Sequence, residues 1–160
     1  EKYEKYNRLI DKIEELGSGM FETEEIYEYV KKQYGTVPEY LWKESPESAV
    51  LRHKNGKWYA VLMQVEKSRL GLGTVDIINV KCEPDMVGVL IETYGFLPGY
   101  HMNKKYWITM LLDGTVSEAK ILDFLDMSYD LIDGMFNVDI FILKMSDAFG
   151  LRKGKNILHF

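Results

Sequence analysis

The sequence has a single cysteine and only 4 prolines among its 160 residues. One cysteine cannot form an internal disulfide, and the chain contains no Asn-x-Ser/Thr signal for glycosylation, so it lacks the usual marks of a secreted protein. The shortage of proline argues against long disordered linkers. These absences favour a folded protein that works in the reducing cytoplasm.

Long apolar runs are also missing from the chain. No run approaches the roughly 20 residues that a membrane-spanning helix requires, and residues 1–6 lack the apolar core of a signal peptide. The remaining composition, 46% hydrophobic and 28% charged, is typical of one globular domain of this length. We therefore expect a compact domain without a membrane segment.

The charge is unevenly distributed along the chain. The net charge is -5, which is unusual for a protein whose affinity would rest on neutralising phosphates. Residues 48–110 nevertheless hold eight Lys and Arg against five Asp and Glu, a local net charge of +3. A modest basic surface inside an acidic protein is therefore compatible with the sequence.

Apolar residues at three- and four-residue steps predict four helices. The first covers residues 3–16. The second covers residues 23–34, with Thr23 as its cap and with Ile26, Tyr27, Val30 and Tyr34 facing the core. A third opens at Pro84, ends before Gly95 and carries the apolar residues Met86, Val89, Leu90 and Tyr94. The last covers residues 117–132 and turns these side chains inward: Ile121, Phe124, Leu125, Tyr129 and Ile132.

Strand-like runs fill the middle of the chain. Residues 49–53 and 57–63 form a hairpin in which Asn55-Gly56 supplies a type I′ turn, and strands follow at residues 75–82 and 106–112. Residues 38–46 form an irregular connector that places Tyr40, Leu41 and Trp42 beneath the sheet. This order predicts an α+β fold, an antiparallel sheet with helices packed mainly on one face. The run 138–143 fits either a strand or a helix.

Two stretches carry a resemblance to a known family, residues 79–84 (NVKCEP) and residues 95–107 (GFLPGYHMNKKYW). Together with residues 38–42, 49–60, 113–114 and 128–131, they are similar to the signature of the MmcQ/YjbR-like family. The resemblance covers residues 22–132. It leaves residues 1–21 as an N-terminal helical extension and residues 133–160 as a C-terminal extension packed on the domain or trailing from it. It implies the two-layer YjbR-like fold of bacterial proteins described as DNA-binding, with no established enzymatic activity.

Two groups of residues are candidates for contacts with nucleic acid. The first lies in the segment 98–107, whose polar residues suit phosphates or bases: His101, Asn103, Lys104 and Lys105. The second lies on and beside the hairpin: Arg52, Lys54, Lys57, Lys67 and Arg69. The alternative for the segment is a structural turn with Pro98, Gly99, Tyr106 and Trp107 in turn or core positions. The alternative for the hairpin is an ordinary solvated sheet edge.

Chemistry-bearing residues do not form a recognisable catalytic or metal-binding motif. Cys82 and the histidines at 53, 101 and 159 lack the spacing of a catalytic or ligand set, and Cys82 is expected to be buried. Four aspartates, at 123, 126, 130 and 133, form an acidic stripe expected to face water. We predict a non-enzymatic DNA-binding module without cofactor or metal. The alternatives are a protein-interaction or chaperone-like module that uses the sheet and the first helix, and a small-molecule site around His101.

Overall fold

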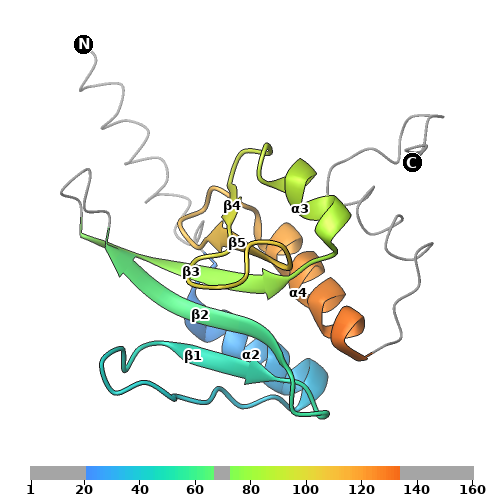
Figure 1. Ribbon diagram of the computed structural model, residues 1–160. Helices are drawn as coiled ribbons and strands as arrows, with labels where there is room; N and C mark the ends of the chain where they lie inside the picture. Colours follow the sequence, from blue (N-terminus) through green and yellow to red (C-terminus); the bar gives the residue numbers. More distant parts are fainter. Residues whose placement is uncertain (1–20, 67–72, 134–160) are drawn as a thin grey trace.

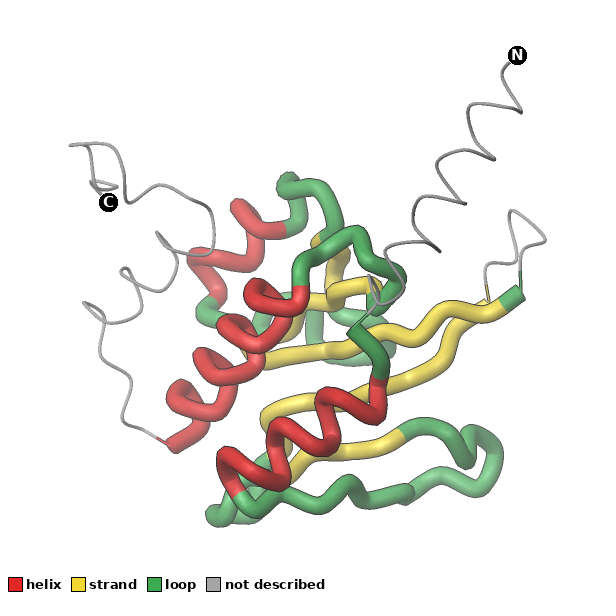
Figure 2. The backbone as a smooth tube through the Cα atoms, turned by 180° about the vertical axis from the view of Figure 1, so that it is seen from behind, coloured by secondary structure: helices red, strands yellow, loops and turns green. Residues whose placement is uncertain are grey.

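The computed structural model describes residues 21–66 and 73–133. It has one twisted antiparallel sheet with helices gathered behind it, as Figures 1 and 2 show from opposite sides. The predicted α+β class with helices on one face is confirmed. The predicted first helix, residues 134–160 of the C-terminal extension, Lys67 and Arg69 lie outside the described residues.

The described part of the chain contributes five strands to the sheet, in the order β1-β2-β3-β5-β4, and every neighbouring pair is antiparallel. Their bounds are β1 Ala49–Arg52, β2 Trp58–Glu66, β3 Thr74–Lys81, β4 Phe96–Pro98 and β5 Trp107–Leu111. Four of these strands match predicted runs. The fifth, β4, was not predicted because it has only three residues and ends in proline, which a strand tolerates at a sheet edge.

Within the described residues, three helices pack behind the sheet, α2 Thr23–Tyr34, α3 Pro84–Leu90 and α4 Glu118–Asp133. The helix α2 ends where Gly35 adopts a φ of 70° and its N–H bonds back to Lys31. Thr23 does not cap this helix as predicted, because Glu22 occupies the cap position without a side-chain bond. The Thr23 hydroxyl instead donates to Asp76 at 3.0 Å and so ties the start of α2 to β3.

The main core fills the space between the sheet and the helices. The inward positions predicted for α4 are buried, as are Ile26, Tyr27 and Val30 on α2. Tyr34, also predicted to face the core, is only partly buried and packs against it. On α3, Met86 and Leu90 are buried as predicted, but Val89 and Tyr94 are 55% and 88% exposed. Val87 is buried in their place. The helix ends at Leu90, so Tyr94 lies beyond the last turn, where helical spacing no longer decides which side a residue faces.

The turn between β1 and β2 differs from the predicted type I′ geometry. Only Gly56 has a positive φ, 87°, and the hairpin closes through His53 N–H donating to Lys57 O at 2.8 Å. The loop therefore has three residues, Lys54 to Gly56. Asn55 acts through its side chain: its Oδ1 accepts from Lys57 N–H at 3.0 Å and its Nδ2 donates to Ile132 O on α4 at 3.1 Å.

The connector before β1 runs beside the sheet and not beneath it. Glu39 and Val50 exchange backbone hydrogen bonds of 3.0 and 2.9 Å, which holds the connector against the edge strand β1. Tyr40 and Leu41 are consequently 57% and 47% exposed, so their predicted burial is wrong. Trp42 alone turns toward the sheet, where it meets Trp58 edge-on at 5.9 Å.

Candidate functional site

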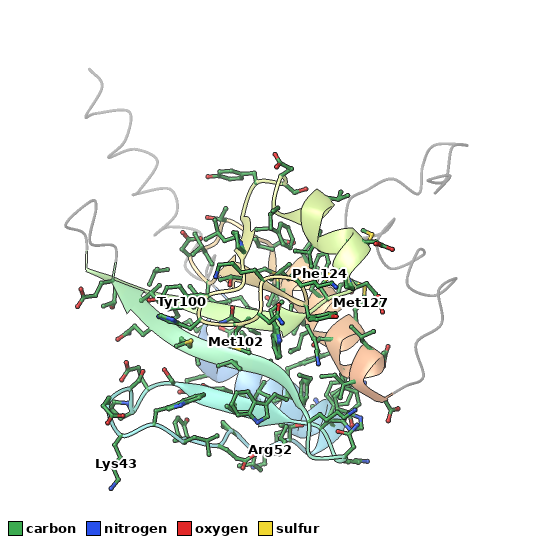
Figure 3. All side chains as sticks on the ribbon, viewed as in Figure 1. Lys43, Arg52, Tyr100, Met102, Phe124 and Met127 are labelled. Carbon is green, nitrogen blue, oxygen red and sulfur yellow. The ribbon has the colours of Figure 1, made fainter. Side chains whose placement is uncertain are left out.

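The face of the sheet opposite the helices carries a second, smaller apolar cluster. Its buried members are Val50, Val61 and Trp107, and partly buried side chains pack against them: Trp42, Trp58, Met63 and Met102. Met102 belongs to the loop between β4 and β5, which Figure 3 shows in front of the sheet. This front face is therefore partly covered by the connector and by the predicted segment 98–107.

A β-bulge aims Trp58 at the front face. The register between β1 and β2 shifts so that Arg52 pairs with Trp58 while Leu51 pairs with Ala60, which leaves Tyr59 unpaired. Tyr59 and Ala60 both join the helix-side core, and Trp58 joins the front cluster. The buried Ser128 of α4 completes the hydrogen bonding. Its hydroxyl donates to Tyr59 O at 2.6 Å and accepts from Lys81 N–H at 2.9 Å.

A buried polar pair holds the loop 99–106 against the front face. Tyr100 N–H lies 3.0 Å from both Asn79 Oδ1 and Thr109 Oγ1, and the Thr109 hydroxyl donates to Asn79 Oδ1 at 2.6 Å. Gly99 passes so close to β5 that a Cβ there would lie 2.9 Å from Trp107 Cβ. The two sequence stretches that carry the family resemblance, residues 79–84 and 95–107, are therefore in contact. The residues at this contact stabilise the fold.

The predicted polar residues of the loop have different surroundings. Asn103 Oδ1 accepts from Lys105 N–H at 3.0 Å, and Lys104 Nζ donates to Gly99 O at 3.0 Å, so both side chains support the loop itself. His101 is exposed and has a φ of 55°. Lys105 projects from the loop with Nζ 5.5 Å from the ring centre of Tyr106. Of the two aromatic residues for which the alternative gave turn or core positions, Trp107 is buried and Tyr106 is 39% exposed.

The hairpin cations also divide into two kinds. Arg52 is engaged in the fold: its Nε lies 2.8 Å from Glu39 Oε2 and a terminal nitrogen donates to Gly56 O at 3.0 Å. Lys54 and Lys57 are exposed at the tip of the hairpin. The hairpin therefore offers two exposed lysines within the described residues.

The fold brings the hairpin and the loop together at one end of the sheet. Lys57, Lys81 and Tyr106 line one recess of about 210 Å³, which also contains Glu83. Lys81 Nζ lies 5.8 Å from the ring centre of Trp107, its partner in the β3–β5 ladder. We call Lys57, Lys81, Lys105 and Tyr106 the basic end. Sequence analysis missed Lys81 as a site residue. The alternation of side chains along β3 could have identified it, because Lys81 lies on the opposite face of the sheet from the buried Val80.

Nucleophilic chemistry has little support at the basic end. Cys82 lines the recess but is only 5% exposed, and burial raises the pKa of its thiol to about 12. A thiol with so high a pKa is almost fully protonated near neutral pH. Within residues 21–66 and 73–133, no group of three potential ligands is placed to hold a metal ion.

The acidic residues of α4 are partly engaged in packing. Asp126 is half-buried and accepts hydrogen bonds from the phenols of Tyr29, at 2.8 Å, and Tyr34. The expectation that the whole stripe faces water is therefore wrong at Asp126, because α2 and α4 pack together there. His53 is buried, with Nε2 3.1 Å from Asp133 Oδ1 but without hydrogen-bond geometry.

No helix of the described part is both long and apolar enough to cross a membrane.

Comparison with known proteins gives consistent matches across the described domain. The family model YjbR matches residues 19–131. The protein named "Uncharacterized protein YyaQ" of Bacillus subtilis is 41% identical over 116 residues, which cover 70% of this chain and 98% of the relative. A crystal structure from Pseudomonas syringae superposes with a TM-score of 0.64 at 37% identity, covering 69% of this chain and 98% of that one.

A more distant structure shares the fold. Protein DR2400 of Deinococcus radiodurans superposes with a TM-score of 0.58 at 19% identity, covering 89% of this chain and 99% of that chain. At this identity the similarity concerns the fold and not the residues of a site.

Proposed function

The chain belongs to the YjbR family, and we propose that it is a non-enzymatic module that binds the phosphate backbone of DNA through the basic end. The observation that carries this proposal is the convergence of Lys57, Lys81 and Tyr106 on one recess, with Lys105 beside Tyr106. These residues come from the hairpin, β3 and the loop before β5. Cations that only keep a sheet edge solvated are not expected to converge on one recess from three separate segments.

The chemistry of the basic end suits phosphates better than base edges. Lysine ammonium groups act as point charges for phosphate oxygens, and the half-exposed Tyr106 ring offers a face on which a base or sugar can pack. Base-specific reading in the major groove typically needs bidentate side chains such as Arg or Asn on a protruding element. Arg52 is already bound to Glu39. We therefore propose binding with little sequence preference.

The charge distribution supports a defined orientation on DNA. Asp76 and Lys81 lie five residues apart on β3, about 17 Å along a strand. The end of β3 that carries Asp76 is surrounded by other carboxylates. The charges of the described residues would attract a polyanion to the basic end and repel it from the end that carries Asp76, so the basic end would face the duplex.

Fluorescence anisotropy with a labelled duplex tests this function. With three phosphates neutralised, the affinity should fall about 40-fold between about 50 and about 200 mM salt. The double variant Lys57→Ala/Lys81→Ala should bind more weakly and lose about 2 from the salt slope. The matched control Lys31→Ala/Lys32→Ala removes two exposed cations from α2, behind the sheet. Absence of binding at low salt, or equal weakening by both pairs, contradicts the proposal.

A protein-interaction role is the second candidate, and exposed apolar side chains favour it. Val89, Ile91 and Tyr94, on α3 and just after it, are 55%, 37% and 88% exposed. Large exposed apolar side chains grouped in one place are typical of contact surfaces. A pull-down can distinguish the α3 surface from the N-terminal extension, residues 1–21, as the site of contact. It compares wild type, Val89→Lys/Tyr94→Lys and a form lacking residues 1–21. Retention of every captured protein by all three forms contradicts a role for either of these surfaces.

A further inference from the structure

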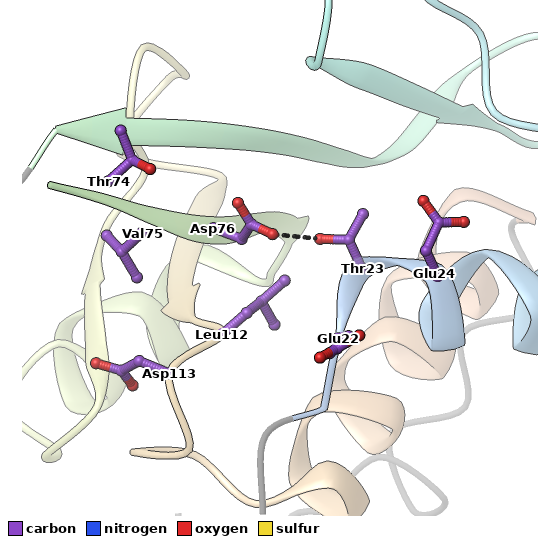
Figure 4. Close-up of a pocket in the computed structure, with 8 residues that line it drawn as sticks. All are labelled: Glu22, Thr23, Glu24, Thr74, Val75, Asp76, Leu112 and Asp113. Atoms are coloured by element: carbon purple, nitrogen blue, oxygen red, sulfur yellow. Dashed lines mark hydrogen bonds between the residues drawn. The ribbon is translucent and has the colours of Figure 1, made fainter. Parts of the chain in front are cut away.

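The recess at the basic end differs in charge from a larger recess at the other end of the sheet. The larger one has a volume of about 410 Å³, and its described lining holds carboxylates and neither Lys nor Arg, as Figure 4 shows: Glu22, Glu24, Asp76 and Asp113. The recess at the basic end has a volume of about 210 Å³ and is lined by Lys57 and Lys81. These charges of the described residues would attract a DNA strand to the second recess and repel it from the first.

The buried part of the lining at the basic end is apolar. Cys82 and Ile132 are 5% and 8% exposed, and Pro84 and Leu131 are partly buried. A charged phosphate is costly to bury against such groups, whereas the flat faces of a nucleobase pack on them well. Pockets that enclose a drug-sized ligand have volumes of about 300–1,000 Å³. A recess of about 210 Å³ therefore suits a single base better than a whole nucleotide.

Tyr106 presents an aromatic ring at the same recess. Its backbone is held on both sides, because its N–H donates to Asn103 O at 3.1 Å and its C=O accepts from Cys82 N–H at 2.8 Å. The residue is 39% exposed, so part of the ring is available to a ligand. Lys105 Nζ lies 5.5 Å from the ring centre. A base that stacks on Tyr106 would thus have an ammonium group beside it for its phosphate.

Glu83 adds a hydrogen-bond acceptor to the lining. Its side chain does not cap α3, although the residue occupies the cap position. Its carboxylate lies close to the apolar lining, because it adds to the rise that burial causes in the pKa of the Cys82 thiol. Every DNA base has at least one N–H on the edge that forms Watson–Crick pairs, and this N–H is free only when the base is unpaired. A carboxylate at this place repels a phosphate but suits an unpaired base.

We propose that the recess receives one unpaired base, and that the basic end consequently prefers single-stranded DNA to a duplex. This inference rests on the proposed DNA binding and specifies the form of DNA that is bound. The base stacks on Tyr106 and donates an N–H to Glu83. The flanking phosphates meet the ammonium groups of Lys57, Lys81 and Lys105. Stacking tolerates every base, so a preference for unpaired DNA requires no sequence preference.

Fluorescence anisotropy with the full chain tests this preference. It compares a labelled DNA strand without self-complementarity, the same strand in its duplex, and the matching RNA strand. At equal salt, the DNA strand should bind about tenfold more tightly than the duplex, the size expected for one stacked base. Phosphate contacts alone predict the opposite order, because a duplex has the higher density of phosphates.

The same titrations separate this inference from the proposed function. A DNA strand that binds no more tightly than the duplex overturns the inference, while binding of the duplex leaves the proposed function standing. Absence of binding by both forms at low salt contradicts both. Tighter binding of the RNA strand than of the DNA strand would assign the recess to unpaired RNA and overturn the choice of DNA.

Replacement of Tyr106 tests the stacking contact. Tyr106→Leu should weaken binding of the single strand about tenfold and that of the duplex much less, whereas Tyr106→Phe keeps the ring and should bind as wild type does. The matched control is Tyr94→Leu, because Tyr94 is 88% exposed and does not line the recess. Equal weakening of single-strand binding by Tyr106→Leu and Tyr94→Leu would overturn the proposal.

Glu83→Ala distinguishes a contact to the base from repulsion of the strand. The variant should keep the fold, as thermal unfolding can show, because the side chain makes no cap bond. Removal of a carboxylate should strengthen binding of the duplex slightly, since less negative charge opposes the phosphates. Binding of the single strand should instead weaken several-fold, because the base loses its acceptor. Stronger binding of both forms would contradict a base in the recess.

Discussion

Replacement of Ser128 by alanine should lower the free energy of unfolding far more than the loss of one surface hydroxyl. The hydroxyl serves two backbone groups at the β-bulge, Tyr59 C=O at 2.6 Å and Lys81 N–H at 2.9 Å. Ser128 and Tyr59 are fully buried. Each backbone group left unpaired costs about 1–3 kcal/mol, so Ser128→Ala should cost about 2–4 kcal/mol, allowing for water near the half-buried Lys81.

Urea unfolding followed by tryptophan fluorescence measures this loss directly, since Trp58 lies beside the bulge. The control is Ser117→Ala, because the exposed Ser117 Oγ accepts one hydrogen bond from the described residues, from Lys120 N–H at 3.3 Å. A cap of this kind contributes about 1 kcal/mol. If Ser128→Ala costs no more than Ser117→Ala, the hydroxyl does not complete the ladder at the bulge, and the explanation of the Trp58 orientation fails.

Other predictions concern the loop, the thiol and the tyrosines. Gly99→Ala should destabilise the protein by about 1–3 kcal/mol, measured by thermal unfolding, because the new Cβ would meet Trp107 Cβ at 2.9 Å. A thiol reagent at pH 8 should label Cys82 slowly in the native protein and rapidly in urea, since burial raises its pKa to about 12; equal rates would contradict this. Burial also raises the pKa of several phenols above the ordinary 10.0, so the unfolded chain loses these protons first. The stabilisation that these phenols contribute should therefore be complete below about pH 10 and decrease above it; the phenols are those of Tyr27, Tyr29, Tyr34 and Tyr59. Urea unfolding at a series of alkaline pH values measures this, and a free energy of unfolding that does not change with pH would refute the assignment.

The sequence predicts those features that depend on local pattern. Strand-like apolar runs identify β2 and β3, and three- and four-residue spacing identifies α2 and α4 with most of their buried positions. The family resemblance identifies the stretch around Asn79 and the loop 99–106 as parts of one signature, but the sequence does not reveal the contact that joins them. That contact is the hydrogen bonding of Tyr100 N–H to Asn79 and Thr109.

Features that depend on contacts between distant segments could not be predicted. The bulge at Tyr59 is stabilised by Ser128, which lies 69 residues away. The burial of Asp126 arises because α2 brings two tyrosines to it. The role of Lys81 in the basic end could not be predicted for the same reason. The recess that it lines forms only when the hairpin approaches the start of β5. Likewise, the DNA-binding candidates at Lys104 and Asn103 are engaged with the loop backbone, which residue type alone does not reveal.

Mapping of amide chemical shifts in the full chain during titration with duplex DNA tests the central claim most directly. DNA binding at the basic end predicts the largest changes at residues 54–58, 81–82 and 104–107, with little change around Glu24 and Asp76. The changes should diminish as salt increases, because phosphate contacts release counterions. Changes centred on α2 or α4, or none at low salt, would contradict DNA binding by the basic end.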